Sequence, residues 1–186
     1  MASLATPAQL AAFLQQPLAN DDASALLMLS IASDMVRDFL QLALDMTTDD
    51  VVYVDPIGGT TVVLPELPVI AVSKLETFDG TVWTTIDPAN YTVSRRMGMI
   101  SANPNTGLHW PFAPESWRVT YTHGYAAIPN SIVGVVLGAA ARAYSSPAGI
   151  DSERIGGYQV KYGMEADGFS AIERKALARY VNPRIA

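Results

Sequence analysis

Few residues of this 186-residue chain have the type and spacing that catalysis or metal binding would need. The chain has no cysteine, which excludes disulfides, thiolate zinc sites and a cysteine nucleophile. Its two histidines, His109 and His123, lack HExxH-type spacing, so we expect both to be structural or exposed. There is no GxSxG elbow, and no glycine-rich segment has the lysine of a phosphate loop. The sequence therefore predicts no catalytic residue, no metal site and no cofactor.

Two other groups of residues admit a chemical interpretation, and each has a simpler structural one. Asp21-Asp22 and Asp49-Asp50 are paired carboxylates, but neighbours in sequence point in different directions and are typical of caps and turns. Trp110, Phe112 and Trp117 could stack on a sugar or a base. We expect them instead to form a hydrophobic cover over a sheet.

The composition favours a role in an assembly. Charged residues make up 16% of the chain, against about 25% in average soluble domains, and apolar residues make up 49%. A surface so poor in charge does not suit a free monomer, so we expect other protein to cover part of it. The N-terminus lacks the features of a signal peptide. The longest apolar stretch, from Ile132 to Ala141, is far shorter than the ~20 residues of a membrane span, so no membrane contact is expected.

The charge is unevenly distributed along the chain, whose net charge is −6. Residues 1–94 contain 12 carboxylates and 2 basic residues, whereas residues 95–186 contain 6 carboxylates and 10 basic residues. We interpret this asymmetry as the mark of an interaction surface. The acidic balance argues against nucleic-acid binding, because affinity for duplex depends on neutralising phosphates with Lys and Arg.

Helix patterns lie towards both ends of the chain. Thr6-Pro7-Ala8-Gln9 has the pattern of a capping box with proline at the first helical position. A second helix is expected from a cap at residues 20–21 to about Asp45, and its apolar arc is so wide that we expect burial on two sides. Pro129 begins an almost wholly apolar helix, and Ser170-Ala171-Ile172-Glu173 predicts a capping box for a last one.

Two glycines interrupt the apolar helix that follows Pro129. Gly134 and Gly138 are four residues apart and therefore lie on one side of the helix. Each costs up to about 1 kcal/mol relative to alanine in a helix interior. We expect close packing of another helix against this side to compensate.

The segment between the helices predicts antiparallel strands. Val51–Val54 and Thr60–Leu64 flank a turn-forming segment and predict a hairpin. Val69–Phe78 and Thr81–Ile86 predict a second hairpin around a tight turn at Asp79-Gly80. Further strands are expected at Tyr91–Val93, Met99–Ile100, Trp117–Thr122 and Tyr158–Tyr162.

The predicted fold class is α+β: a small bundle of about four helices with an inserted antiparallel unit of about six or seven short strands. The expected segments are the N-terminal helices at 1–48, the β region at 49–127, and a buried helix with a C-terminal docking segment at 128–186. Together they should form one compact unit, with helices over more than a third of the chain.

The order of these segments resembles one known family. Val119–Tyr125 reads Val-Thr-Tyr-Thr-His-Gly-Tyr and precedes the helix that starts at Pro129, and Ser152–Tyr158 reads Ser-Glu-Arg-Ile-Gly-Gly-Tyr. With the capped helices before them and Glu173–Tyr180 behind, these segments resemble the head-tail connector (adaptor, or head-completion) proteins of long-tailed phages. The resemblance spans nearly the whole chain, although compact family members are mainly helical and lack the strands between about Val51 and Ile100.

The resemblance implies a ring, expected to be a dodecamer, docked under the portal protein in the phage neck after assembly in the host cytoplasm. It implies portal contact through about Asp151–Ala186, a stopper or tail-completion protein as a further partner, and duplex DNA passing without sequence-specific binding. The acidic N-terminal half is expected to face the channel, where negative charge repels phosphates. The residues expected at portal or subunit contacts are Arg154, Tyr158, Tyr162, Arg174, Lys175, Arg179, Tyr180 and Arg184.

Three other functions remain as alternatives. A stopper or tail terminator would also build a neck or tail ring, and is expected to be mainly β. A β-rich module for a glycan or a cell surface would use Trp83, Trp110 and Trp117. An enzyme would need a pocket in which His123 or His109 meets two carboxylates.

Overall fold

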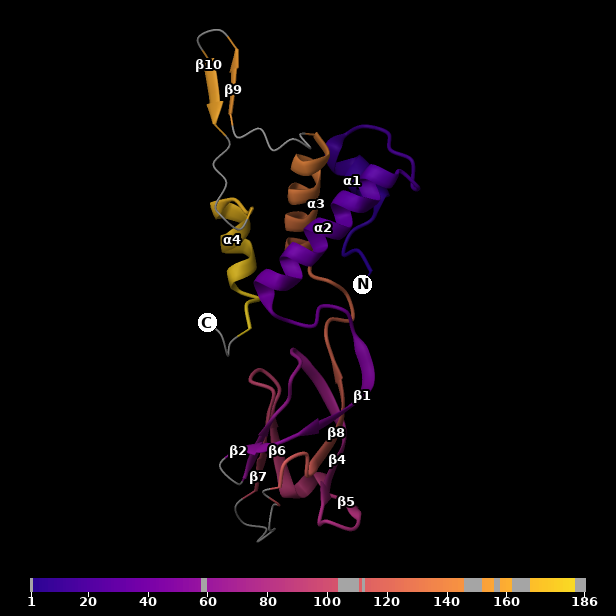
Figure 1. Ribbon diagram of the computed structural model, residues 1–186, viewed down its shortest axis with the longest axis vertical. Coiled ribbons are helices and arrows are strands. Elements are labelled where there is room, and N and C mark those ends of the chain that lie inside the picture. Colours follow the sequence, from indigo (N-terminus) through magenta and orange to yellow (C-terminus); the bar gives the residue numbers. More distant parts are fainter. Residues whose placement is uncertain are drawn as a thin grey trace. The chain divides into compact units, whose positions relative to one another are not determined.

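The chain divides into two units, which are described separately below. A computed structural model describes residues 2–57, 60–103, 111, 113–145, 152–155, 158–161 and 168–182, with 152–155 and 158–161 by their backbone. The helical unit consists of Met1–Gln41 with Ile128–Val181, and the sheet unit is mainly Leu42–Ala127. The described residues form four α-helices and two four-stranded antiparallel sheets, which confirms the α+β class (Figure 1).

Four helices build the helical unit: α1 (Pro7–Leu14), α2 (Ala23–Leu40), α3 (Asn130–Ser145) and α4 (Ala171–Ala178). Both predicted capping boxes are confirmed, at Thr6 and at Ser170, because each side chain accepts the N–H of the third helical residue. α2 ends earlier than the predicted Asp45, since Gln41 adopts a left-handed conformation with φ 51°. In the described part of the chain the helices have 8, 18, 16 and 8 residues, less than the expected third of the sequence.

Helix α3 is the centre of the helical unit and packs against the other three helices (Figure 1). Helix α2 turns Leu29, Val36 and Leu40, all fully buried, into this core. The second apolar stripe of α2 is not buried in this core, because Leu27 is 55% exposed and Ile31 is 46% exposed. The expectation that α2 is buried on two sides is therefore wrong for the single chain.

The described part of the sheet unit contains eight strands in two antiparallel sheets, with the orders β1-β8-β4-β5 and β2-β3-β7-β6. Both sheets contribute to one hydrophobic core, to which β8 supplies the fully buried Trp117, Val119 and Tyr121 at alternate positions. The strands are β1 (Thr47–Val54), β2 (Pro56–Ile57), β3 (Thr61–Val63), β4 (Val69–Phe78), β5 (Trp83–Thr85), β6 (Tyr91–Ser94), β7 (Met99–Ala102) and β8 (Trp117–His123).

The first predicted hairpin is wrong and the second is confirmed with a different loop. β1 pairs with β8 instead of β3, because the chain crosses to the second sheet at Asp55-Pro56 and β2 takes the place beside β3. β4 pairs with β5 as expected. Their connection has four residues, Asp79–Val82, and is held by Asp79 Oδ1, which accepts hydrogen bonds from the N–H groups of Thr81 and Val82.

A short antiparallel ladder follows α3 in the sequence. Here β9 (Ser152–Ile155) pairs with β10 (Tyr158–Lys161), so the strand expected at Tyr158–Tyr162 is found with a partner that the sequence pattern did not predict. Among the described helices, none is long and apolar enough to cross a membrane.

Candidate interaction surfaces

His123 is the histidine that the described residues include, and its surroundings are structural. Its Nε2 lies 3.2 Å from Oδ2 of Asp50, and its ring packs on Tyr121 with centroids 4.9 Å apart. Its Nδ1 has no hydrogen-bond partner among the described residues. Within the described ranges it meets one carboxylate, that of Asp50, whereas the enzyme alternative requires two. No group of three metal-ligating residues occurs in the described ranges, and His109 lies outside them.

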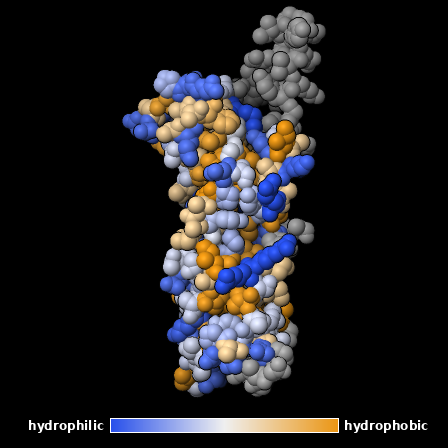
Figure 2. Space-filling view, turned by 180° about the vertical axis from the view of Figure 1, so that it is seen from behind, coloured by the Kyte–Doolittle hydropathy of each residue, from blue (hydrophilic) through white to orange (hydrophobic). Residues whose placement is uncertain are grey.

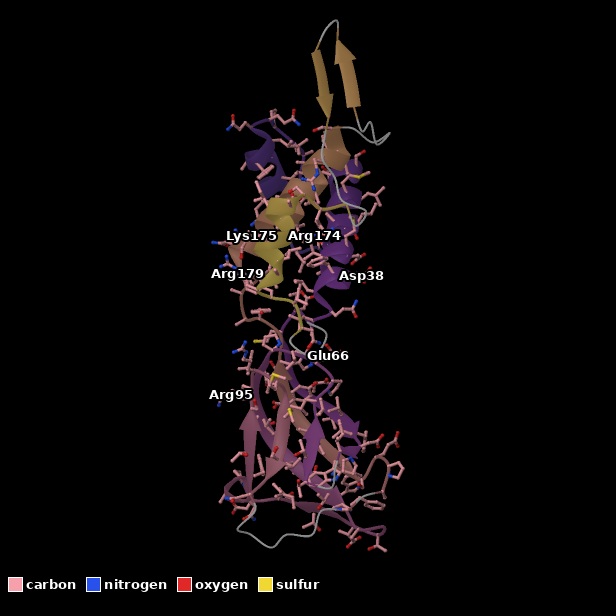
Figure 3. The ribbon with its side chains drawn as sticks, turned by 90° about the vertical axis from the view of Figure 1, so that its left-hand side faces the viewer. Asp38, Glu66, Arg95, Arg174, Lys175 and Arg179 are labelled. Atoms are coloured by element: carbon pink, nitrogen blue, oxygen red, sulfur yellow. The ribbon has the colours of Figure 1, made fainter. Side chains whose placement is uncertain are left out.

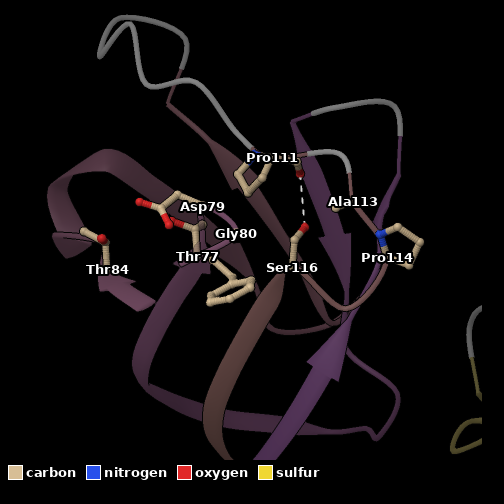
Figure 4. Close-up of a pocket in the computed structure, with 9 residues that line it drawn as sticks. Thr77, Asp79, Gly80, Thr84, Pro111, Ala113, Pro114 and Ser116 are labelled. Carbon is tan, nitrogen blue, oxygen red and sulfur yellow. Dashed lines mark hydrogen bonds between the residues drawn. The ribbon is translucent and has the colours of Figure 1, made fainter. Parts of the chain in front are cut away.

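A hollow near the β4–β5 loop has one ionisable residue in its described lining (Figure 4). Its ionisable member is Asp79, whose pKa is lowered by hydrogen bonds from Val82 and Thr81 that it receives as a loop-forming residue. Ser116 donates its hydroxyl to the carbonyl of Pro111 at 3.3 Å, so its oxygen is not activated by a base. The lining residues are Thr77, Phe78, Asp79, Gly80, Thr84, Pro111, Ala113, Pro114 and Ser116.

Helix α4 presents a basic face in the helical unit. Lys175 and Arg179 are exposed, and because they are four residues apart they share one side of the helix (Figure 3). Ile172, on the same side, is 83% exposed. Arg174 is exposed elsewhere around the helix. This basic and apolar side is suited to binding an acidic protein surface.

The position of α4 is fixed by charged and polar contacts to α3. Arg142 donates two hydrogen bonds to the Glu173 carboxylate, at 2.7 and 3.0 Å, and Ser131 and Tyr180 join their hydroxyls at 2.9 Å. Burial raises the pKa of Glu173, but the hydrogen bonds from Arg142 and Ser170 outweigh it and hold the pKa below its ordinary value. The basic face is therefore carried by an anchored helix.

The two glycines of α3 differ in their surroundings. A Cβ at Gly138 would lie 2.6 Å from Oε1 of Glu173, so α4 comes close to α3 at this point. A Cβ at Gly134 would meet no described atom within 4 Å, and Gly134 is exposed. The close helix approach within the single chain is thus at Gly138.

Alanine at these two glycines is expected to act in opposite directions. Gly134→Ala should stabilise the isolated chain by about 0.5–1 kcal/mol, because alanine is the better helix former and the site has space. Gly138→Ala should destabilise it by about 1 kcal/mol, because the new methyl displaces the Glu173 carboxylate from Arg142 and this loss exceeds the helix-propensity gain. Urea unfolding of both variants measures the difference, and equal stabilisation by both would contradict it.

Helix α2 presents an acidic and apolar face that the sequence analysis did not select. Leu27 and Ile31 are followed on the same side by Asp34 and Asp38, both exposed. Asp34 pairs locally with Arg37 at 3.2 Å, while the Asp38 carboxylate makes no ion pair within the described residues. The apolar arc of the helix was the sequence pattern that could have revealed this face.

Aromatic residues gather on the surface of the sheet unit, but not as a tryptophan platform. Trp117 is fully buried and donates its indole N–H to the Pro111 carbonyl at 3.1 Å. Trp83 is half-buried, and its face is covered by the Arg118 guanidinium, 4.6 Å from the ring centroid. Trp110 lies outside the described residues. This arrangement argues against a glycan module built on the three tryptophans.

Of the eight residues expected at portal or subunit contacts, the structure describes the side chains of four, and all four lie on α4 or directly after it: Arg174, Lys175, Arg179 and Tyr180. Tyr180 is turned towards α3 by its bond to Ser131, and the Arg179 guanidinium lies 6.0 Å from its ring. Arg154 is in β9 and Tyr158 is in β10. Tyr162 and Arg184 lie outside the described residues.

Exposed apolar side chains occur in both units. In Figure 2 apolar residues, in orange, reach the surface over the helices as well as over the sheets. Single exposed apolar residues are common on soluble proteins. In this chain few charged residues lie between them, so they form larger apolar areas on the surface. The large ones are Phe13, Leu26, Leu27, Ile31, Met46, Val51, Tyr53, Ile57, Ile70, Val82 and Ile172.

Comparison with known proteins shows a shared fold. No protein-family model and no curated protein sequence matches the chain. Three solved structures each match 98% of this chain, and the match covers 94% of their own chains. The neck of an empty gene transfer agent (GTA) particle computed with C6 symmetry has a TM-score of 0.54 and 19% sequence identity. The neck of a native GTA particle computed with C12 symmetry has a TM-score of 0.55 and 20% identity, and the virion of a native GTA particle has a TM-score of 0.53 and 20% identity. The fold is therefore shared with these chains over almost its whole length.

Proposed function

We propose that this chain is a non-enzymatic structural protein of a tailed phage or phage-like particle, the adaptor that joins the head to the tail. The observation that carries the proposal is the fold shared over 98% of the chain with chains from particle necks. The exposed apolar residues of both units and the low charge content support it, because a ring would cover such surfaces.

The proposed partners follow from the same assignment. Neighbouring copies form a ring, expected to be a dodecamer, which docks on the portal protein through the C-terminal segment at about Asp151–Ala186. Its arginines and tyrosines are of the types enriched at interface anchors. A stopper or tail-completion protein binds the other side of the ring. Assembly takes place in the host cytoplasm, and the finished location is the neck of the virion.

Duplex DNA is proposed to pass through the ring without sequence-specific binding. Residues 1–94 contain 12 carboxylates against 2 basic residues, so a lumen lined by this half would repel phosphates. A structure of the assembled ring tests this, because a lumen lined by Arg and Lys would contradict it.

The purified chain is expected to be monomeric and to form the full ring on the portal. The physical reason is that exposed ion pairs contribute little individually, so a template that holds many copies together raises the local concentration. Native mass spectrometry with and without portal measures the change in mass. A stable dimer that portal does not affect would contradict the expectation.

Deletion of the gene from a particle-producing strain tests the proposed function. We expect DNA-filled heads without tails, restored to tailed particles by the wild-type gene in trans. Tails of abnormal length on intact necks would indicate a tail terminator instead. Portal binding by the purified chain separates an adaptor from a stopper, which should bind only after another neck protein is present. Normal particles from the deletion strain would refute a neck role.

A further inference from the structure

Two exposed helix faces of the helical unit have the same residue spacing and opposite charge. On α2 the series is Ile31, Asp34 and Asp38, and on α4 it is Ile172, Lys175 and Arg179. Both series follow the pattern i, i+3, i+7, which keeps all three side chains on one side of a helix.

The equal spacing gives the two faces matching dimensions. With a rise of about 1.5 Å per residue, the first charge lies about 4.5 Å and the second about 10.5 Å along the axis from the isoleucine in both helices. If the helices pack side by side in parallel, Ile31 meets Ile172. Asp34 then lies opposite Lys175, and Asp38 lies opposite Arg179, so that each basic group faces a carboxylate.

These faces do not pair within one chain. In the helical unit α3 packs against both α2 and α4. Figure 3 shows Lys175 and Arg179 on one side of the unit and Asp38 on the other. Across the described residues neither the Asp38 carboxylate nor the Lys175 ammonium makes an ion pair, and both isoleucines are exposed. Contact between the faces therefore requires a second copy of the chain.

We infer that the α4 face of one copy packs in parallel on the α2 face of the next, as the head-to-tail contact of the ring; this rests on the proposed function. α2 and α4 both run downwards in the view of Figure 1. If the ring axis lies along the vertical of that view, rotation about it brings the two helices together without reversing either one. The isoleucines form the apolar end of the contact, and the charged pairs that follow fix its register. The hydrogen bonds of Arg142 with Glu173 and of Ser131 with Tyr180 fix α4 in position for this contact.

Disulfide trapping tests the contact directly, because the chain has no native cysteine. Ile31→Cys and Ile172→Cys variants, mixed at high concentration and oxidised, should give a covalent dimer, because oxidation traps a contact that the monomeric chain makes only transiently. The double variant should give a ladder of longer chains. The control is Ile31→Cys mixed with Ile57→Cys, a residue of the sheet unit that is 59% exposed. We expect at least about tenfold more cross-linked product than from this control, and equal yields would overturn the inference.

Charge reversal then separates a specific contact from misfolding. Asp38→Lys in the Ile31→Cys chain should lower the cross-linked yield about tenfold, because it places like charges opposite each other. Arg179→Glu in the Ile172→Cys chain should restore the yield, since the pair is rebuilt with its charges exchanged. Arg95→Glu, an equivalent change at an exposed turn of the sheet unit, should not. Restoration by both or by neither would contradict the predicted register.

The outcome is distinguishable from that of the proposed function. If particles contain the chain in their neck but the cysteine pair does not cross-link there, the contact is wrong and the function stands. If the pair cross-links in solution but the deletion strain makes normal particles, the contact stands and the function fails.

Discussion

Gly124→Ala is expected to destabilise the sheet unit by at least about 3 kcal/mol. Gly124 has a φ of 86°, and a Cβ there would lie 2.2 Å from the carbonyl oxygen of Asp45 and 2.7 Å from its carbon. The backbone cannot move away freely, because the N–H of Gly124 donates to Pro68 at 3.0 Å and that of Tyr125 donates to Leu44 at 3.1 Å. Urea unfolding, followed by the fluorescence of the tryptophans, measures the loss.

Gly80→Ala is the matched control for this substitution. Gly80 also has a positive φ, 101°, but a Cβ there would meet no described atom within 4 Å. Its cost should be limited to backbone strain of about 1 kcal/mol. Equal losses in the two variants would mean that strain, and not the approach of the Asp45 backbone, makes glycine necessary at position 124.

Glu76→Gln is the second substitution with a large expected effect, a loss of about 3 kcal/mol. Glu76 is 5% exposed and accepts two hydrogen bonds from Arg118 on the neighbouring strand, each 2.8 Å, with Lys74 Nζ also at 2.8 Å. The amide removes the charge that compensates the partly buried Arg118. Lys74→Met is the control and should cost far less, because the Lys74 side chain is 48% exposed.

The same carboxylate makes the stability of the sheet unit depend on pH. The pKa of Glu76 is lowered from 4.5 to about 2. The hydrogen bond from Arg118 has the largest effect, and together with that from Lys74 it outweighs burial, which raises the pKa. The unfolded chain therefore binds more protons between these values, and the stabilisation present above pH 4.5 is lost as the pH falls towards 2. The unfolding free energy of the wild type should fall as the pH is lowered through this range. Glu76→Gln should remove the part of this pH dependence that comes from Glu76.

Local chemistry was predictable from the sequence, and non-local pairing was not. The capping boxes at Thr6 and Ser170 depend on residues three apart, so the pattern alone located both helix starts. The partner of β1 is β8, more than sixty residues away, and nothing within β1 distinguishes β8 from the nearer β3. The left-handed Gln41 that ends α2 is likewise a residue type without a strong preference for that position.

The candidate contact residues show the same division. Arg174, Lys175 and Arg179 were expected at contacts with other proteins and are exposed, but the inward turn of Tyr180 depends on Ser131, in another helix. For α2 the sequence shows a wide apolar arc without showing what covers it. The helix was expected to be buried on two sides, and the structure leaves Leu27 and Ile31 exposed in the single chain. A pattern of apolar residues cannot distinguish a face buried within its own chain from a face buried against another chain, because both contain the same kind of side chain.

The parallel bridge between Asp45 and Tyr125 brings the chain's entry into the sheet unit beside its exit. A module whose two ends are neighbours can be removed or exchanged at little cost in loop-closure entropy. Replacement of 42–127 by a few glycines and serines should therefore leave a folded four-helix remnant. Insertions of other sizes could therefore occupy the same junction without changes in the helices.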